Sequence, residues 1–457
     1  MKHPIFFLLT FLTIVNISCK KEKYTLLNEK IQVDAPFKMP PIIIPDFKLA
    51  PTFIITDFGA ITDDKEKNSI AIEKAIHEAN KIGGGTVIIP EGEWVTKKIH
   101  FKSNVNLHLK KGAILLFSEN PEDYLPAVHT TWEGMECYNY SPLIYAYKCK
   151  NIAITGEGKL KAKMEIWKKW FARPKPHMES LKRLYTMASY NKPVEERQMV
   201  NDSAHFRPQF IQFNRSEHIL LEGVSIENSP FWTIHPYLSK DVVIRNVNVF
   251  AKGHNNDGVD PEMSQNILIE NCVFDQGDDA IAVKSGRNQD AWKLNTPSKN
   301  IVMRNCTMIN GHQLLAIGSE LSGGIENVWV ENCTVEANAK MFHLVFIKTN
   351  ERRGGYVKNI YVENITSKTI EKGVLGIETD VLYQWRDLVP TIERKLTPIE
   401  NIYLTKITTS KARYLSKIIG QTELPIKNVN LDNVVVDSIL EQKHIHENVL
   451  NFKELSK

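Results

Sequence analysis

The eleven residues Ser264–Phe274, SQNILIENCVF, carry the pattern that decides the fold. A near copy, SKNIVMRNCTM, occupies Ser298–Met308, and further copies stand on both sides. The interval between copies runs from 23 residues (223 to 246) to 42 residues (364 to 406). Such self-similarity is typical of a chain that stacks repeated units into a solenoid. The position of Asn271 recurs at Gly223, Asn246, Asn305, Asn332, Asn364, Lys406 and Asn433.

Each repeat contains short β-branched runs separated by Gly, Asn and Asp, which favours strands and turns without a helix in every unit. We therefore predict an all-β fold, a right-handed parallel β-helix in which a single chain winds one coil per repeat. The repeated Asn can stack in the same turn of successive coils. Cys272, Cys306 and Cys333 follow this Asn and are interpreted as core positions. Cys137 and Cys149 could pair, and the sequence does not decide this.

Upstream of the repeats, residues 63–85, DDKEKNSIAIEKAIHEANKIGGG, predict one clear helix. Apolar residues recur there at spacings of three, four and seven, and the three glycines end the pattern. A solenoid needs its open end covered, so we expect an N-terminal capping helix. We place the cap and first coils at residues 51–118, the β-helix catalytic domain at 119–440 with an inserted, partly helical loop at 163–208, and a C-terminal tail at 441–457.

The N-terminus resembles an export signal. Lys2 supplies a positive charge, and the apolar run Ile5–Val15 is too short for a membrane-spanning helix. Cys19, followed by KKEK, is similar to the lipidation site of a bacterial lipoprotein, although Asn16 stands where Leu is usual. The alternative is an ordinary cleaved signal. We expect residues 1–19 to be a lipoprotein-type signal peptide, and the proline-rich residues 20–50 to be an extended tether.

The composition is that of an ordinary globular protein, with 42% hydrophobic and 24% charged residues. There are 57 basic and 53 acidic residues, a formal net charge of +4, and no basic block. This balance argues against nucleic-acid binding and permits an anionic substrate without requiring one. We expect an exported monomer without metal or cofactor, held in the bacterial envelope by its lipid anchor and touching the membrane only through it.

The most unusual residues fall at matching places in neighbouring repeats. Asp278 and Asp279 open an apolar strand, although adjacent carboxylates repel each other and resist desolvation. Asp257 lies 22 residues before Asp279, about one coil, and His312 and Lys348 belong to later repeats. Because neighbouring coils stack about 4.8 Å apart, we expect three carboxylates, an imidazole and an ammonium along one face.

Such a cluster suits glycosidic hydrolysis, in which one carboxyl donates a proton and another activates water or attacks. Each part also has a structural interpretation. Gly-Asp-Asp is often a turn, NNDGVD resembles a turn or a calcium loop, His312 could be a structural hydrogen-bonding residue, and Lys348 could face solvent. Recurrence on successive coils favours catalysis. Strand parity would turn Asp279 toward the core, so we predict that Gly277 permits a bend that turns both carboxylates outward, with Ala280 and Ala282 as a small-residue floor.

These motifs resemble the polygalacturonase family, glycoside hydrolase family 28, over about residues 50–440. Its members are right-handed parallel β-helices that cleave α-galacturonosyl bonds in pectin with inversion. The family's Asn-Thr-Asp motif is similar to Asn255-Asn256-Asp257, and Gly-Asp-Asp is unchanged at residues 277–279. The resemblance implies that Asp278 is the general acid, and that Asp257 and Asp279 position and deprotonate water.

Two further motifs of the family are only partly kept. Gly-His-Gly is Gly311-His312-Gln313, which implies a catalytic His312 beside a bulkier neighbour. Arg-Ile-Lys is Phe346-Ile347-Lys348, and a Phe cannot replace a bidentate clamp for a uronate carboxylate. Either Arg352 or Arg353 compensates, or the sugar beside the scissile bond differs. The substrate-binding set that we predict is Asn255, Lys284, Arg287, Gln313, Lys348, Arg352 and Arg353.

The segments KSGRN, residues 284–288, and GSELSGG, residues 318–324, resemble the exo-acting bacterial branch of the family. The long insertion would wall one end of the groove. We therefore expect exo-cleavage of pectic or related acidic polysaccharides. The alternatives are a β-helix polysaccharide lyase, whose product carries a new double bond, and a non-catalytic glycan-binding solenoid.

Overall fold

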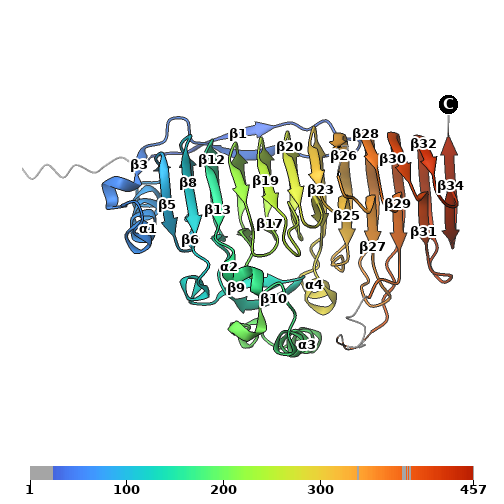
Figure 1. Cartoon of the computed structure of the whole chain (residues 1–457), viewed down its shortest axis with the longest axis horizontal. Helices are drawn as coiled ribbons and strands as arrows, with labels where there is room; N and C mark the ends of the chain where they lie inside the picture. The colour runs from blue at the N-terminus through green and yellow to red at the C-terminus, as the bar shows by residue number, and fades with distance from the viewer. Residues whose placement is uncertain (1–23, 337–338, 383–387, 389, 391–392, 456–457) are drawn as a thin grey trace, which may run out of the picture.

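The computed structural model describes residues 24–336, 339–382, 388, 390 and 393–455. The predicted signal peptide and Cys19 lie outside these residues. The chain forms an elongated stack of coils, with the first and last coils at opposite ends (Figure 1). Within the coils, each strand pairs in parallel with a strand one coil away, as β20 (Gln265–Glu270) does with β23 (Ser298–Arg304). The predicted all-β parallel β-helix is confirmed.

The larger sheet contains 20 strands. In the last coils one long strand replaces the two shorter strands of earlier coils. Its other strands are β3 (Thr52–Ile54), β4 (Gly85–Ile89), β5 (Gly92–Thr96), β7 (Val105–Leu109), β8 (Ala113–Phe117), β12 (Lys150–Gly156), β13 (Lys159–Ala162), β15 (Glu217–Glu222), β16 (Ser225–Glu227), β18 (Lys240–Arg245), β19 (Asn248–Ala251), β21 (Val273–Gln276), β24 (Thr307–Asn310), β26 (Ile325–Val335), β28 (Val357–Thr369), β30 (Ile399–Ala412), β32 (Ile426–Ile439) and β34 (Val449–Leu455).

Shorter strands make a second row along the solenoid, which we call the catalytic face after the predicted catalytic residues that border it. It consists of a four-stranded and a six-stranded sheet, joined through single bridges from Ile234 to Val259 and from Val259 to Ile281. Its strands are β6 (Ile99–His100), β11 (Ile144–Tyr147), β14 (Ile211–Asn214), β17 (Ile234–Tyr237), β22 (Ile281–Val283), β25 (Gln313–Gly318), β27 (His343–Lys348), β29 (Gly373–Glu378), β31 (Tyr414–Ile419) and β33 (His444–Glu447).

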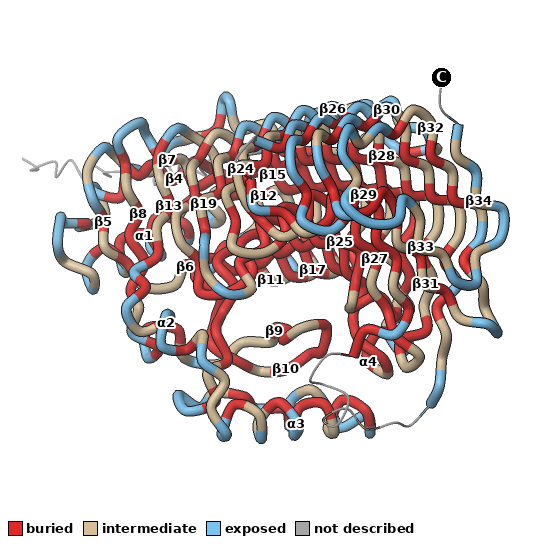
Figure 2. The backbone as a smooth tube through the Cα atoms, turned by 45° about the vertical axis from the view of Figure 1, so that its right-hand side comes forward, coloured by how far each residue is buried: buried red, intermediate tan, exposed pale blue. Residues whose placement is uncertain are grey.

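Apolar side chains from every coil fill the interior as one continuous core, and the buried stretches recur from coil to coil (Figure 2). Cys272, Cys306 and Cys333 belong to this core, which confirms their predicted place. Cys137 and Cys149 are buried and free, so they form no disulfide in this structure.

A ladder of asparagine side chains runs along one turn of the coils. Asn300 donates to Asn266 at 3.0 Å, Asn327 donates to Asn300 at 3.0 Å, and the series continues to Asn451. The ladder therefore lies mainly at the first Asn of SQNILIENCVF. The second, Asn271, has a φ of 55°. This left-handed backbone, which Asn tolerates better than most residues, is shared along its column.

The predicted capping helix is α1 (Lys65–Lys81). The carboxylate of Asp64 accepts a hydrogen bond from the amide of Lys67 at 3.0 Å and caps the first turn. Ala71, Ile72 and Ile76 are buried against the first coils. The helix covers the open N-terminal end of the solenoid (Figure 1). Among the described residues, no helix is long and apolar enough to cross a membrane.

The predicted tether is wrong for residues 24–50. This segment forms two antiparallel strands, β1 (Leu27–Ile31) and β2 (Ile42–Asp46), which lie along the large sheet. Ile42 and Ile44 are almost fully buried against apolar side chains that point out of that sheet. The repeats leave an apolar stripe outside the core, and this strap covers it. The stripe consists of Ala153, Leu220, Val243, Leu268, Val302 and Trp329.

The predicted C-terminal tail is also wrong. Strands β33 and β34 pair with the preceding coil and add a further turn to the solenoid. This coil was not recognised in the sequence, because the side chains at its inward positions are partly polar. Ser416 contacts both His444 and His446, at 2.7 and 2.8 Å.

Helices and one hairpin project from the catalytic face (Figures 1 and 2). The inserted loop contains α2 (Glu165–Lys169) and α3 (Lys175–Ser189). The antiparallel hairpin of β9 (Val128–Trp132) and β10 (Met135–Asn139) precedes it in the chain. The remaining short helices are α4 (Asn288–Leu294), η1 (Ile55–Phe58), η2 (Pro121–Tyr124), η3 (Val194–Glu196) and η4 (Asp202–Ala204).

Candidate active site

A shift in strand alternation places the acids. Ala280 and Ile281 both lie in the core, although adjacent residues of a regular strand face opposite ways. Asp279 before them and Ala282 after them can therefore both face outward. The next coils repeat this double core position at 314–315, 344–345 and 374–375. The predicted bend exists, but it falls at Ala280–Ile281 and not at Gly277.

Gly277 has a different role from the predicted one. A Cβ atom at this position would lie 2.3 Å from the carbonyl oxygen of Gly253 in the neighbouring coil. Gly277 thus permits two turns to approach closely, which brings the Asp278 turn against the turn that carries Asp257. Ala280 belongs to the core, so the prediction that it forms an open floor is wrong.

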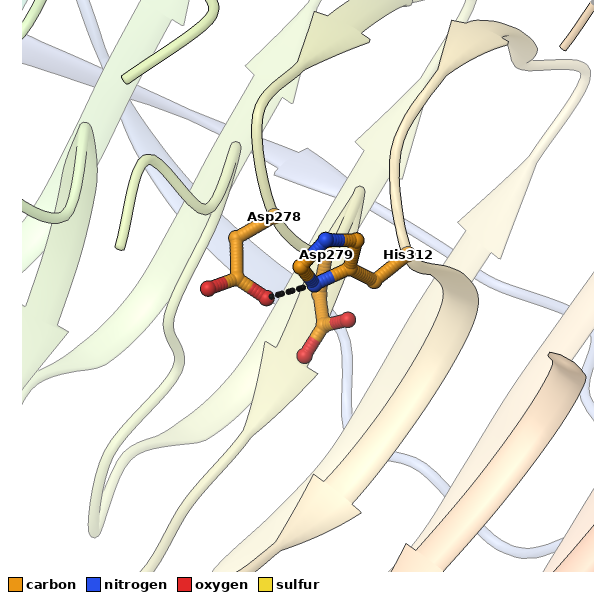
Figure 3. Close-up of side chains that lie close together, drawn as sticks. All are labelled: Asp278, Asp279 and His312. Atoms are coloured by element: carbon orange, nitrogen blue, oxygen red, sulfur yellow. Dashed lines mark hydrogen bonds and ion pairs between the residues drawn. The ribbon is translucent and has the colours of Figure 1, made fainter. Parts of the chain in front are cut away.

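Asp278 and His312 form a direct pair across adjacent coils. The Nδ1 atom of His312 lies 2.9 Å from Oδ1 of Asp278 (Figure 3). Burial acts to raise the pKa of Asp278, but the hydrogen bond and charge of His312, with the charges of Lys348 and Lys284, outweigh it and lower that pKa. Burial acts to lower the pKa of His312, but the same hydrogen bond, together with the negative charges of Asp278, Asp279 and Asp257, outweighs it and raises that pKa. The pair is therefore arranged to hold one shared proton.

Asp257 and Asp279 form the second part of the cluster. The amide of Asp279 donates to Oδ1 of Asp257 at 3.3 Å, and Nζ of Lys348 lies 3.7 Å from Oδ2 of Asp279. Both aspartates are nearly inaccessible, with 3% and 1% exposure. Burial, with repulsion from the neighbouring aspartates, outweighs the attraction of Lys348 and raises the pKa of Asp279 to about 7. Burial and the charge of Asp278 also raise the pKa of Asp257.

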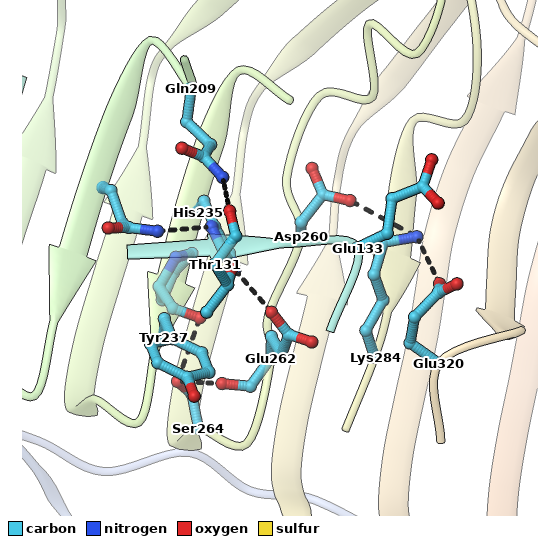
Figure 4. A network of polar contacts seen from close by, with 12 residues as sticks. Thr131, Glu133, Gln209, His235, Tyr237, Asp260, Glu262, Ser264, Lys284 and Glu320 are labelled. Atoms are coloured by element: carbon cyan, nitrogen blue, oxygen red, sulfur yellow. Dashed lines mark hydrogen bonds and ion pairs between the residues drawn. The ribbon is translucent and has the colours of Figure 1, made fainter. Parts of the chain in front are cut away.

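Lys284 is a buried cation behind these acids. Its Nζ lies 3.6 Å from carboxylate oxygens of Asp257, Asp260 and Glu320, two of which appear in Figure 4. It also lies over the ring of Trp232, 4.6 Å from the centroid. Burial acts to lower the pKa of Lys284, but these carboxylates outweigh it and raise that pKa well above its ordinary value. The role of Lys284 in substrate binding stays a prediction.

Arg287 holds the tip of the β9–β10 hairpin. Its Nε donates to the carbonyl oxygen of Glu133 at 2.9 Å, and its amide donates to the carbonyl oxygen of Gly134 at 3.0 Å. Its guanidinium also contacts the Glu320 carboxylate and the Tyr185 hydroxyl. Arg287 thus fixes the hairpin tip in place. Direct substrate binding by Arg287 stays a prediction.

The other predicted substrate-binding residues lie around the same cluster. Gln313 pairs with His343 in the strand register, and its carbonyl oxygen accepts from the amide of Ala280 at 2.9 Å. Arg353 is buried, and its Nη1 donates to Asn288 at 2.8 Å. The amide of Arg352 donates to Asn350 at 3.0 Å. Compensation for the missing Arg by Arg352 or Arg353 stays a prediction.

Phe346 occupies the place of the family's arginine. Its ring stacks on His343 with centroids 4.5 Å apart and an interplanar angle of 11°. Nζ of Lys348 lies 5.8 Å from the Phe346 ring centroid. The register aligns Phe346 with Ala316 and Ala282 on the preceding coils. The side of the cluster toward the C-terminal coils therefore presents an aromatic ring with one ammonium.

Sequence reasoning missed the cations on the opposite side. Arg207 is buried, and its guanidinium donates to the side-chain oxygen of Asn255 at 3.0 Å. Asn255, which we predicted to bind substrate, therefore accepts a hydrogen bond from a protein group here. Arg173 lies 2.8 Å from His254. Burial, Arg207 and Arg173 together lower the pKa of His254 to about 4, although Asp278 is near enough to oppose them. Both arginines come from the inserted loop or its end. Nothing in the sequence indicated that they lie beside His254 and Asn255.

The β9–β10 hairpin closes the catalytic face on the side of the N-terminal coils. The hydroxyl of Thr130 donates to Gln212 at 2.9 Å, and Asn214 donates to the carbonyl oxygen of His129 at 3.0 Å. Gln212 and Asn214 both belong to β14, which lies three coils before β22 along the face. Behind the hairpin, Trp132 packs with Leu181 and Leu184 of α3. Hairpin and insertion thus form one wall.

Comparison with known proteins agrees with this geometry. The family model described as glycosyl hydrolases family 28 matches residues 191–454. This chain belongs to that family. The match spans the coils that carry all four predicted catalytic residues, and it ends in the final coil.

One solved structure is similar over nearly its whole length, and two curated relatives are similar over a little more than half of theirs. A crystal structure of a hyperthermoactive exopolygalacturonase from Thermotoga maritima is 35% identical in sequence and has a TM-score of 0.83. The match covers 91% of this chain and 93% of the exopolygalacturonase chain. A probable polygalacturonase from Vitis vinifera is 30% identical over 69% of the chain and 61% of its own length. An exo-poly-alpha-D-galacturonosidase from Dickeya chrysanthemi is 27% identical over 70% of the chain and 55% of its length. The chain thus spans only a little over half of these two curated relatives.

Proposed function

We propose that this family 28 protein is an exo-acting hydrolase of α-galacturonosyl-type bonds in pectic or related acidic polysaccharides. The observation that carries the proposal is the contact cluster of Asp257, Asp278, Asp279 and His312 on neighbouring coils. Its relatives include proteins named exopolygalacturonase and exo-poly-alpha-D-galacturonosidase, which supports this bond type.

In the proposed mechanism, Asp278 donates the proton of the Asp278–His312 pair to the leaving glycosidic oxygen. Asp257 and Asp279 hold a water and remove its proton as it attacks the anomeric carbon. Atoms of Asp278, Asp279 and His312 lie within 4.8 Å of one another. This is closer than the roughly 6.5–9.5 Å usual for inverting carboxylate pairs. Inversion is therefore supported by family membership and not by the spacing of Asp278 and Asp279.

The exo preference follows from the wall. A polysaccharide that reaches Asp278 can continue toward β25 and β27, because the hairpin occupies the face over β14. One chain end would therefore stop against the hairpin tip, which Arg287 fixes near Glu320. Phe346 and Lys348 then lie beside the sugar on the open side. This arrangement limits each cleavage to a short product from the chain end.

The N-terminal segment supports an exported protein anchored by a lipid on Cys19. The strap starts at Tyr24, whose amide donates to the carbonyl oxygen of Ile82 at 2.9 Å, next to the capping helix. A lipidated Cys19 would therefore hold the capped end of the solenoid close to the membrane. Mass spectrometry of the membrane fraction tests this, because Cys19→Ser should release the protein.

The test of the activity uses a panel of homogalacturonan, rhamnogalacturonan and short oligouronides. The wild-type protein should release reducing ends without ultraviolet absorbance from a new double bond, and Asp278→Asn should lose at least about a thousandfold in kcat while keeping its fold. Proton NMR of the first product should show the inverted anomer. A double-bond product would indicate a lyase, and turnover by Asp278→Asn would remove Asp278 as the acid.

A further inference from the structure

A cavity opens on the catalytic face, on the far side of the hairpin from the acids. It has a volume of about 330 Å³ and is lined largely by aromatic and imidazole rings. A volume of this size is at the lower end of the range for small-molecule sites, about 300–1,000 Å³. The rings are those of His100, Phe101, His129, Tyr138, Tyr145 and Tyr147.

The rings form two stacked pairs. Tyr145 and Tyr147 have centroids 6.0 Å apart and an interplanar angle of 12°. His129 and Tyr138 have centroids 5.6 Å apart and an angle of 17°. The pairs come from different elements, β11 and the hairpin, and the Tyr145 hydroxyl ties them together through the carbonyl oxygen of His129 at 2.6 Å. Tyr138 and Tyr147 are only partly buried. A pyranose ring presents flat C–H faces to such rings, and its hydroxyls remain free for polar edges.

Cations flank this cavity. Nζ of Lys148 lies 5.0 Å from the Tyr147 ring centroid. An adjoining cavity of about 510 Å³ shares His100 and Phe101 and is also lined by Lys102. Lys102 and Lys148 are exposed. The adjoining cavity also has Glu66 and Glu73 on its helical side, and Glu66 pairs with Lys97 at 2.6 Å. Aromatic faces beside exposed ammonium groups fit a sugar that carries a carboxylate.

The cavity lies on the same face of the solenoid as the catalytic cluster, nearer the N-terminal end. Tyr145 aligns with Gln212 and then His235, and Tyr147 aligns with Asn214 and then Tyr237. Four coils separate β11 from β22, or roughly 20 Å at about 4.8 Å per coil. The hairpin stands between them, so the cavity cannot be an extension of the catalytic subsites along one uninterrupted chain.

We propose that this aromatic cavity is a secondary binding site for a uronic-acid-containing polysaccharide, separate from the catalytic cluster. It would hold a neighbouring chain or a looped segment of the substrate while a chain end reaches Asp278. Holding the polymer raises the effective concentration of chain ends at the catalytic face without contributing to bond cleavage. The identity of the polymer as an acidic pectic glycan rests on the proposed function.

The experiment measures retention of the full-length protein in native gels that contain homogalacturonan. All variants carry Asp278→Asn to prevent degradation, and a saturating short oligouronide fills the catalytic face. Tyr147→Ala and Tyr138→Ala should each weaken retention about fivefold. Tyr190→Ala removes a tyrosine that is 64% exposed and outside the cavity, so it should leave retention unchanged. Lys148→Ala should reduce retention most at low salt.

Kinetics in the otherwise wild-type chain separate this site from catalysis. Tyr147→Ala and Tyr138→Ala should raise KM on homogalacturonan several-fold and leave kcat and KM on short oligouronides unchanged. Equal retention of both variants and the parent would overturn the proposal, as would equal loss on short and long substrates. Because retention is measured without turnover, an inactive wild-type protein would reject the proposed activity and leave this binding test intact.

Discussion

The imidazole of His312 lies 2.9 Å from the carboxylate of Asp278, although 34 residues separate them in the chain. This contact exists because neighbouring coils place equivalent turns side by side. It links the acid to a base whose pKa is raised by the same hydrogen bond. The pair can therefore keep a proton available at a pH at which an isolated aspartate would have lost it.

Replacing His312 tests this shared proton. In His312→Asn the proton must reside on Asp278 alone, so the basic limb of the kcat/KM profile should move to lower pH. We also expect kcat to fall about a hundredfold. Rate measurements from pH 4 to 9 on a short oligouronide provide the check. An unchanged basic limb would mean that His312 has only a structural role.

Asp279 should impose a stability cost that grows with pH. Its pKa is about 7 in the folded protein and near 3.8 when unperturbed, so ionisation between these values favours the unfolded chain. Asp279→Asn should therefore have a Tm close to that of the wild type at pH 4, and a Tm a few degrees higher at pH 7.5. Differential scanning calorimetry across this range measures the difference.

Asp278 provides the matched control, because its pKa is shifted in the opposite direction. Its ionised form adds stability above its ordinary pKa, so Asp278→Asn should lower the Tm near neutral pH. A pH-independent gain in both variants would contradict this assignment of charges.

Phe346 should determine how strictly a free carboxylate is required beside the scissile bond. The wild-type protein should discriminate little between an oligogalacturonate and its methyl ester. Phe346→Arg should favour the free acid at least about fivefold in kcat/KM, since a guanidinium pairs with a carboxylate. It should also lower stability, because the buried ring stacks on His343. Unchanged discrimination in a folded Phe346→Arg variant would place the carboxylate elsewhere.

The strap should be required for stability and not for chemistry. Ile44 is 1% exposed and packs on the outer apolar stripe. Ile44→Ala should cost on the order of 3 kcal/mol in the free energy of unfolding and leave kcat intact. Leu49→Ala, at a side chain that is 83% exposed, should be nearly neutral. Denaturant unfolding of both variants decides whether the segment is a strap or a loosely attached tether.

Local repetition made much of this fold predictable. Copies of SQNILIENCVF predicted the coils, their stacking and the gathering of Asp257, Asp278 and Asp279. In a solenoid, residues that are one repeat apart in the sequence lie side by side on neighbouring coils. The strap was not predictable in this way. Its apolar residues Ile42 and Ile44 lie among prolines and have meaning only against a stripe on the outside of other coils. The last coil was hidden by His444 and His446, which are polar where earlier coils are apolar.

The candidate site was predictable in its acids but not in its boundaries. The hairpin wall depends on contacts such as Thr130 with Gln212, which are 82 residues apart and carry no motif. The cations Arg173 and Arg207 come from a loop whose path the sequence does not specify. Lys284 and Arg287 were recognised, yet their contacts with Glu320 could be seen only once the coils were stacked.

Product sizing during the first few per cent of homogalacturonan hydrolysis tests the central claim most directly. If the hairpin wall ends the catalytic face beside the cluster of Asp257, Asp278 and Asp279, only mono- or disaccharide should accumulate from the earliest time points, while the viscosity of the polymer falls slowly. An early ladder of intermediate oligomers with a rapid loss of viscosity would show internal cleavage and contradict the account.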